Sequence, residues 1–105
     1  MTRRILAVVP DLMDRSRLRA GAGYEVRFVR VDELADPTVV DPTTVDLVVV
    51  DLARSGIVEA LAGADLGVDV VGFGPHVDQD LLEAAAMHCT RVLKRSTLFQ
   101  NWPDV

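Results

Sequence analysis

The sequence is poor in features that would mark a function directly. Its single cysteine, Cys89, excludes an internal disulfide and favours a reducing, cytoplasmic environment. The apolar run at 5–9 is far too short for a signal sequence or a membrane span. No P-loop, serine nucleophile elbow or cluster of zinc ligands is present. We therefore expect neither a secreted nor a membrane protein.

Positive charge is also in deficit, because 11 basic residues face 16 acidic ones and the formal net charge is −5. This balance argues against a nucleic-acid partner, whose phosphates bind basic surfaces. Arginines do concentrate in the first third of the chain, and we interpret them mainly as a solvated face. They are Arg3, Arg4, Arg15, Arg17, Arg19, Arg27 and Arg30.

Aromatic residues are few, but half of the 105 residues are hydrophobic, which suffices for one compact core. That core must consist mainly of Val, Leu, Ala and Ile, as in a parallel sheet covered by helices. The predicted strands are 5–9, 24–29, 47–50, 68–73 and 91–94. Their alternation with helices predicts one flavodoxin-like α/β domain over 1–105, with three layers and the strand order 2-1-3-4-5.

The helices are expected to be uneven. Asp11 is predicted to cap a first helix whose Leu12, Met13 and Leu18 face the core. Asp-Pro pairs at 36–37 and 41–42 disfavour a full second helix, because a residue before proline avoids helical geometry. We expect a loop at 31–45 with one helical turn near 32–35. The remaining helices are predicted to begin at Arg54 or Ser55, after Asp78, and at Ser96 or Thr97.

The candidate site lies where the strands end. Asp51 closes the third strand, Asp11 follows the first, and Lys94 ends the fifth. Ligands of open α/β sheets bind outside the carboxyl ends of the strands, so these three side chains could meet. Two carboxylates could hold Mg²⁺ together with waters and phosphate oxygens, which makes Asp11 and Asp51 candidate metal ligands.

These residues resemble those of the response-regulator receiver domain, and the resemblance covers nearly the whole chain. The run at 46–51 is similar to the third strand of that family, which ends in its phosphoacceptor aspartate, here Asp51. Gly56 matches a glycine of the following loop, and Val92-Leu93-Lys94 resembles the fifth strand with its lysine. The resemblance implies a signalling protein that is phosphorylated on Asp51 with Mg²⁺.

The chain also departs from the receiver pattern. The acidic pair that holds Mg²⁺ in the family falls on Val9 and Pro10, with Asp11 one position late. The switch hydroxyl after the fourth strand falls on Gly74. Arg91 and Arg95 replace the family's aromatic residue and proline around the fifth strand. The resemblance is therefore to an atypical receiver, or pseudo-receiver.

Three functions follow as hypotheses. The first is a stand-alone receiver-like regulator that acts through protein contact, more as a binding protein than an enzyme, in which Asp51 is structural and pairs with Lys94. The second is a phosphorylatable regulator with Asp51 as phosphoacceptor. The third is a ligand-binding module or enzyme that uses the turn after the fourth strand. That turn contains Gly72, Gly74, His76 and Asp78, and its plainer interpretation is a tight turn with Asp78 as a helix cap.

The last helix carries Leu98, Phe99 and Trp102. Aromatic side chains near a terminus either cover their own sheet or form an interface. The reduced second helix leaves one sheet face thinly covered, and a parallel sheet needs both faces covered. We therefore expect a protein partner, of which a second copy of the chain is one form. Cys89 is expected to be a small packing residue.

Overall fold

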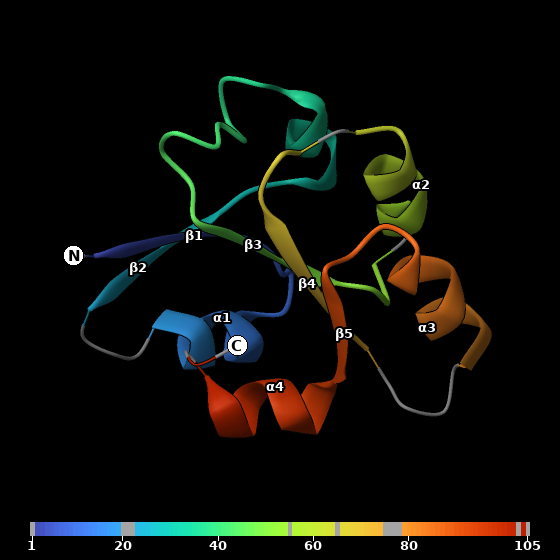
Figure 1. The fold of residues 1–105 in the computed structure, drawn as a ribbon. Coiled ribbons are helices and arrows are strands. Elements are labelled where there is room, and N and C mark those ends of the chain that lie inside the picture. The colour runs from blue at the N-terminus through green and yellow to red at the C-terminus, as the bar shows by residue number, and fades with distance from the viewer. Residues whose placement is uncertain are drawn as a thin grey trace.

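The sheet has the predicted topology. The computed structural model describes residues 2–19, 23–54, 56–64, 66–74, 79–102 and 104. Within them, five parallel strands form one sheet in the order β2-β1-β3-β4-β5 (Figure 1). The strands are β1 (Arg3–Val8), β2 (Tyr24–Phe28), β3 (Leu47–Asp51), β4 (Asp69–Gly74) and β5 (Arg91–Lys94). This order is that of the flavodoxin-like fold, which confirms the fold prediction.

Helical segments cover both faces of the sheet. They are α1 (Leu12–Arg19), the 3-10 helix η1 (Val31–Ala35), α2 (Ile57–Ala62), α3 (Gln79–Ala86) and α4 (Arg95–Asn101). Leu18 of α1 and Leu98 of α4 belong to one buried cluster. Leu34 of η1 and Leu61 of α2 belong to the cluster on the other face. Figure 1 shows α1 and α4 together on one side of the sheet, and η1, α2 and α3 on the other.

The central strand β3 explains how Asp51 is oriented. Val48 and Val50 lie in the η1/α2/α3 cluster, whereas Leu47 and Val49 lie in the α1/α4 cluster. Successive side chains of a strand point to opposite faces, so Asp51 continues the row of Leu47 and Val49. The carboxylate therefore ends β3 on the side of α1 and α4.

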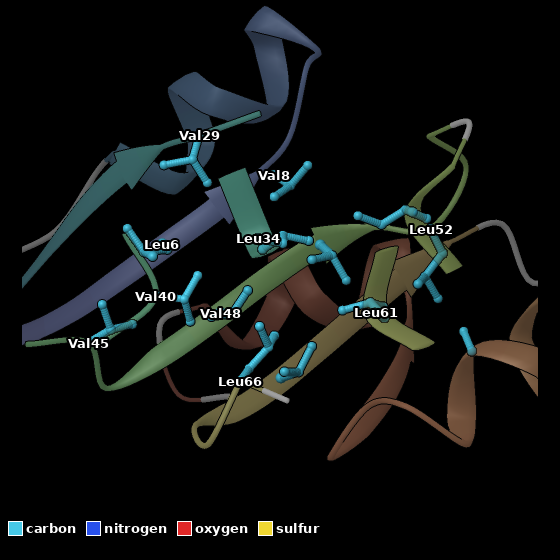
Figure 2. Close-up of a cluster of buried hydrophobic side chains, with 14 residues drawn as sticks. Leu6, Val8, Val29, Leu34, Val40, Val45, Val48, Leu52, Leu61 and Leu66 are labelled. Carbon is cyan, nitrogen blue, oxygen red and sulfur yellow. The ribbon is translucent and has the colours of Figure 1, made fainter. Parts of the chain in front are cut away.

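A loop replaces the second helix, as the Asp-Pro pairs predict. Asp36 accepts hydrogen bonds from the backbone N–H and hydroxyl of Thr38, and Asp41 accepts the same pair from Thr43. These two Asp-Pro-Thr turns are Asx-type turns, in which the carboxylate replaces a backbone acceptor. Figure 2 shows Val40 and Val45 of this loop beside Leu34 and Leu6. The chain itself thus covers much of the face that the missing helix would cover.

Three local predictions were wrong. Leu12 and Met13 are 76% and 72% exposed, because α1 turns the face that carries Asp14 and Leu18, four residues apart, toward the core. α2 begins at Ile57 rather than at Arg54, after Gly56 in the left-handed region (φ 81°); Ser55 is outside the described residues. α4 begins at Arg95, directly after β5, with no side-chain cap.

Gly72 and Gly74 of β4 form a matched pair for testing the packing. A Cβ at Gly72 would approach Leu52 Cδ2 to 2.9 Å and Cys89 Sγ to 3.1 Å, whereas a Cβ at Gly74 would meet side-chain atoms at 3.5 Å. We expect Gly72→Ala to destabilise the fold by about 1–2 kcal/mol, because Leu52 is buried and has little room to move. Gly74→Ala should be close to neutral. Equal urea midpoints for the two variants would contradict this packing.

Candidate functional site

Asp51 lies half-buried at the end of β3. The backbone N–H of Ala53 donates to its Oδ1 at 3.0 Å, and the N–H of Arg54 donates to its carbonyl at 3.1 Å. Burial raises the pKa of the Asp51 carboxyl, and the charges of Asp14 and Asp11 raise it further. The hydrogen bond from Ala53 and the charge of Arg95 oppose this shift in pKa.

The strongest polar contact at this edge is the pair formed by Asp14 and Arg95. Asp14 lies in the first turn of α1 and its residue is 1% exposed. Arg95 is the first residue of α4, and its Nη1 donates to Asp14 Oδ2 at 2.6 Å while its Nη2 donates to Oδ1. Two parallel N–H donors on two carboxylate oxygens form a bidentate pair, the favoured geometry for arginine and carboxylate. This hydrogen bond is the main cause that raises the pKa of Arg95.

Asp11 caps α1, as predicted. Its Oδ1 accepts the backbone N–H groups of Met13 at 2.9 Å and Asp14 at 3.1 Å. We call Asp11, Asp14, Asp51 and Arg95 together the acidic crevice. It contains three carboxylates and one guanidinium, and the three other groups all act on the pKa of Asp51.

Lys94 does not take part in the acidic crevice. It is exposed at the end of β5, and none of the ion pairs found among the described residues involves it. Leu93 packs in the α1/α4 cluster and Val92 in the opposite one, so strand alternation places Lys94 on the face away from Asp51. The cation beside Asp51 is Arg95, one residue further along the chain.

Several carboxylate oxygens of the acidic crevice are already bonded within the protein. Both oxygens of Asp14 bind Arg95, and Oδ1 of Asp11 accepts two backbone N–H groups. Within the described residues, no group of three or more His, Cys, Asp or Glu side chains could hold a metal. Mg²⁺ uses one or two carboxylates and completes its octahedron with water, so it could use Asp14 only if the guanidinium of Arg95 moved away. The predicted use of Asp11 and Asp51 as a metal pair stays a prediction.

The turn after β4 is described only in part. Gly72 and Gly74 are buried strand residues, and His76 and Asp78 lie outside the described residues. The small size of Gly72 accommodates Leu52 and Cys89 of the protein itself. Cys89 is half-buried, and burial raises the pKa of its thiol.

The side chains of the α4 segment contact the core of their own domain. Leu98 is fully buried, and Phe99 and Trp102 pack against the same cluster. Trp102 Nε1 donates to the hydroxyl of Tyr24 at 2.7 Å and to the carbonyl of Leu18 at 3.2 Å. Phe99 and Trp102 are partly exposed, so part of each side chain is open to a partner.

The fold and the site together define a class: a flavodoxin-like α/β domain with a half-buried aspartate at the end of its third strand. No protein-family model matches the chain, and no curated protein is significantly similar to it. Among the described residues, no helix is long and apolar enough to span a membrane.

The acidic crevice makes a prediction about pH dependence. The pKa of Asp51 is higher in the folded state than in the unfolded chain, so the carboxyl ionises more easily when the protein is unfolded. The free energy of unfolding therefore falls as the pH rises from the unfolded pKa through the folded one. We expect Asp51→Asn to stabilise the fold at neutral pH by about 1 kcal/mol or less, because solvent screens the half-buried carboxyl and the amide oxygen can still accept from Ala53. The gain should shrink as the pH falls through the raised pKa of Asp51 and disappear below about pH 4, where the carboxyl is protonated in both states. Urea unfolding at several pH values measures it, and a variant less stable than wild type at pH 7 would contradict it.

Proposed function

We propose that the protein is a stand-alone, atypical receiver-like regulator that acts through contact with another protein, without phosphorylation-driven switching. The strand order β2-β1-β3-β4-β5 and the position of Asp51 support the comparison with receivers. The proposal includes a role in signal transduction in the cytoplasm. Its central part concerns the acidic crevice, where the receiver pattern and this chain differ most.

The observation that carries the proposal is the bidentate pair between Asp14 and Arg95 beside Asp51. Phosphoryl transfer depends on cations that neutralise the charge developing on the phosphoryl oxygens. Here the nearby guanidinium is already bound to a buried carboxylate, and Asp11 adds a further negative charge. A phosphodonor that approaches Asp51 therefore meets net negative charge.

The end of β4 supports the same conclusion. A receiver needs a hydroxyl at this position to follow the phosphoryl group, and Gly74 has no side chain. Leu52 and Leu82 lie 3.5 Å from the point where a Cβ of Gly74 would be, so apolar groups surround the position. A phosphoryl group on Asp51 would therefore find no hydroxyl at this position to bind.

Exposed apolar side chains support action through protein contact. Leu12 and Met13 are largely exposed on the first turn of α1, next to Asp11 of the acidic crevice. Neighbouring exposed apolar side chains of this size are a feature of interaction surfaces. If the partner is a second copy, sedimentation should show self-association that Leu12→Ser with Met13→Ser weakens. A monomer at every concentration would contradict the homodimer.

Phosphorylation is tested by incubating the protein with Mg²⁺ and acetyl phosphate and measuring its intact mass. We expect an unchanged mass, because the guanidinium of Arg95 is already bound to Asp14 and the acidic crevice carries net negative charge. Asp51→Asn is the matched control. A mass increase of one phosphoryl group that disappears in Asp51→Asn would overturn the proposal and make Asp51 a phosphoacceptor.

A further inference from the structure

A cavity of about 440 Å³ lies at the carboxyl edge of the sheet, separate from the acidic crevice. It is bounded by the end of β1, the segment after β2 and the turn after β3. Val8 and Val29 belong to its lining and to the η1/α2/α3 cluster (Figure 2). Ligands of this fold class bind where the strand order reverses, which is beside β1 in this sheet. Both the size and the position are those of a small-molecule site.

Arg15 is held in place at this cavity. Its Nε donates to the carbonyl of Val9 at 2.6 Å, and its guanidinium lies over the ring of Phe28 at 5.1 Å. One nitrogen and one face of the group are thus fixed by the protein. No ion pair among the described residues involves Arg15, so the two terminal nitrogens remain for an anion. A guanidinium fixed in this way loses little conformational freedom when it binds.

Two more arginines line the same cavity. Arg54 follows β3, is exposed, and has no ion-pair partner within the part of the chain that the structure describes. Arg30 follows β2, and its Nε lies 3.2 Å from Asp32 Oδ1 and 3.7 Å from Glu33 Oε1. The charge of Arg30 is therefore largely balanced, whereas those of Arg15 and Arg54 are not. Two unbalanced guanidiniums match the charge of a phosphate monoester.

From this geometry we propose that the cavity binds a small organic phosphate of mononucleotide size. Arg15 and Arg54 hold the phosphate, because the planar guanidinium donates two parallel hydrogen bonds to phosphate oxygens. The organic part lies against the apolar lining formed by Val8, Val29 and Val31. The site stands on different residues from the acidic crevice, so it does not depend on how Asp51 functions.

The test is a titration of the ¹⁵N-labelled protein with AMP, GMP, CMP and UMP, one at a time, followed by amide NMR shifts. At least one should bind saturably and shift the amides of Val9, Arg30 and Val31. Adenosine, which has no phosphate, and inorganic phosphate, which has no organic part, should each bind at least about tenfold more weakly. Arg15→Gln and Arg54→Gln should each weaken the mononucleotide about tenfold, since each removes a charged hydrogen-bond donor.

Arg91→Gln is the matched control, because it makes the same charge change on an exposed residue. Arg91 begins β5 and so lies at the end of the sheet away from the cavity. It should leave the affinity within about twofold of wild type. Arg54→Gln keeps the test valid if Arg15→Gln also alters folding, because Arg54 has no ion pair among the described residues. Absence of binding by all four mononucleotides up to about 10 mM would overturn the proposal. So would binding that Arg91→Gln weakens as much as Arg54→Gln does.

Discussion

The free energy of unfolding of an Arg95→Gln variant is expected to be about 2–4 kcal/mol lower than that of the wild type, because the variant leaves a buried carboxylate without its charged partner. Asp14 is 1% exposed while Arg95 covers it, so the variant takes two charge-assisted hydrogen bonds away from a largely buried carboxylate. The Arg95 side chain is 46% exposed, which puts the effect below that of a fully buried pair. Urea unfolding at neutral pH measures the loss.

Arg17→Gln is the matched control for this variant. The guanidinium groups of Arg17 and Arg95 both lie over the ring of Phe99, at 5.2 and 5.3 Å, but among the described ion pairs only that of Arg95 reaches Asp14. Arg17→Gln should cost about 1 kcal/mol or less. The double variant Asp14→Asn with Arg95→Gln should be less unstable than the sum of the single variants. Equal losses for Arg17→Gln and Arg95→Gln would contradict the importance of the pair.

Trp102→Ala is expected to destabilise the isolated domain by about 2–3 kcal/mol, because the indole belongs to the α1/α4 core. The ring meets that of Tyr24 edge to face at 5.5 Å, and its Nε1 donates to Tyr24 and to the carbonyl of Leu18. These contacts join the end of the chain to β2 and α1. The residue is partly exposed, which keeps the effect below that of a fully buried tryptophan.

Tyr24→Phe separates the hydrogen bond from the packing. It removes the hydroxyl that Trp102 Nε1 contacts at 2.7 Å and keeps the ring. We expect it to cost about 0.5–1 kcal/mol, since Nε1 retains the carbonyl of Leu18 as an acceptor. If Trp102→Ala changed only self-association and left the unfolding of the monomer unaltered, Trp102 would be an interface residue rather than part of the core.

The fold could be predicted from the sequence because the local signals of the chain agree with one another. The valine run of β3 predicts a doubly buried strand, and the Asp-Pro pairs predict the loop that replaces the second helix. One error came in the first turn of α1. Leu12 and Met13 lie six and five residues before the buried Leu18, so they fall on other sides of the helix and are exposed. Their hydrophobic character alone therefore gave the wrong buried face.

The acidic crevice was predicted only in part. Asp11 and Asp51 were identified from their positions after the strands, whereas Asp14 and Arg95 were not identified as site residues. A signal for Asp14 was present, because it lies four residues before the buried Leu18 and so on the same helix face. A buried acid predicts a cationic partner, but its identity depends on how α1 and α4 pack. The family pattern favoured Lys94, which strand alternation places on the other face.

A titration of the wild-type protein with Mg²⁺, followed by the amide shifts of Asp14, Asp51 and Ala53, tests the central claim most directly. That claim is that Arg95 is committed to Asp14 and the acidic crevice does not support phosphorylation of Asp51 with Mg²⁺. We predict no saturable shift up to about 10 mM Mg²⁺, because both oxygens of Asp14 are occupied. A saturable shift of these amides in the wild type, lost in Asp51→Asn, would contradict the claim.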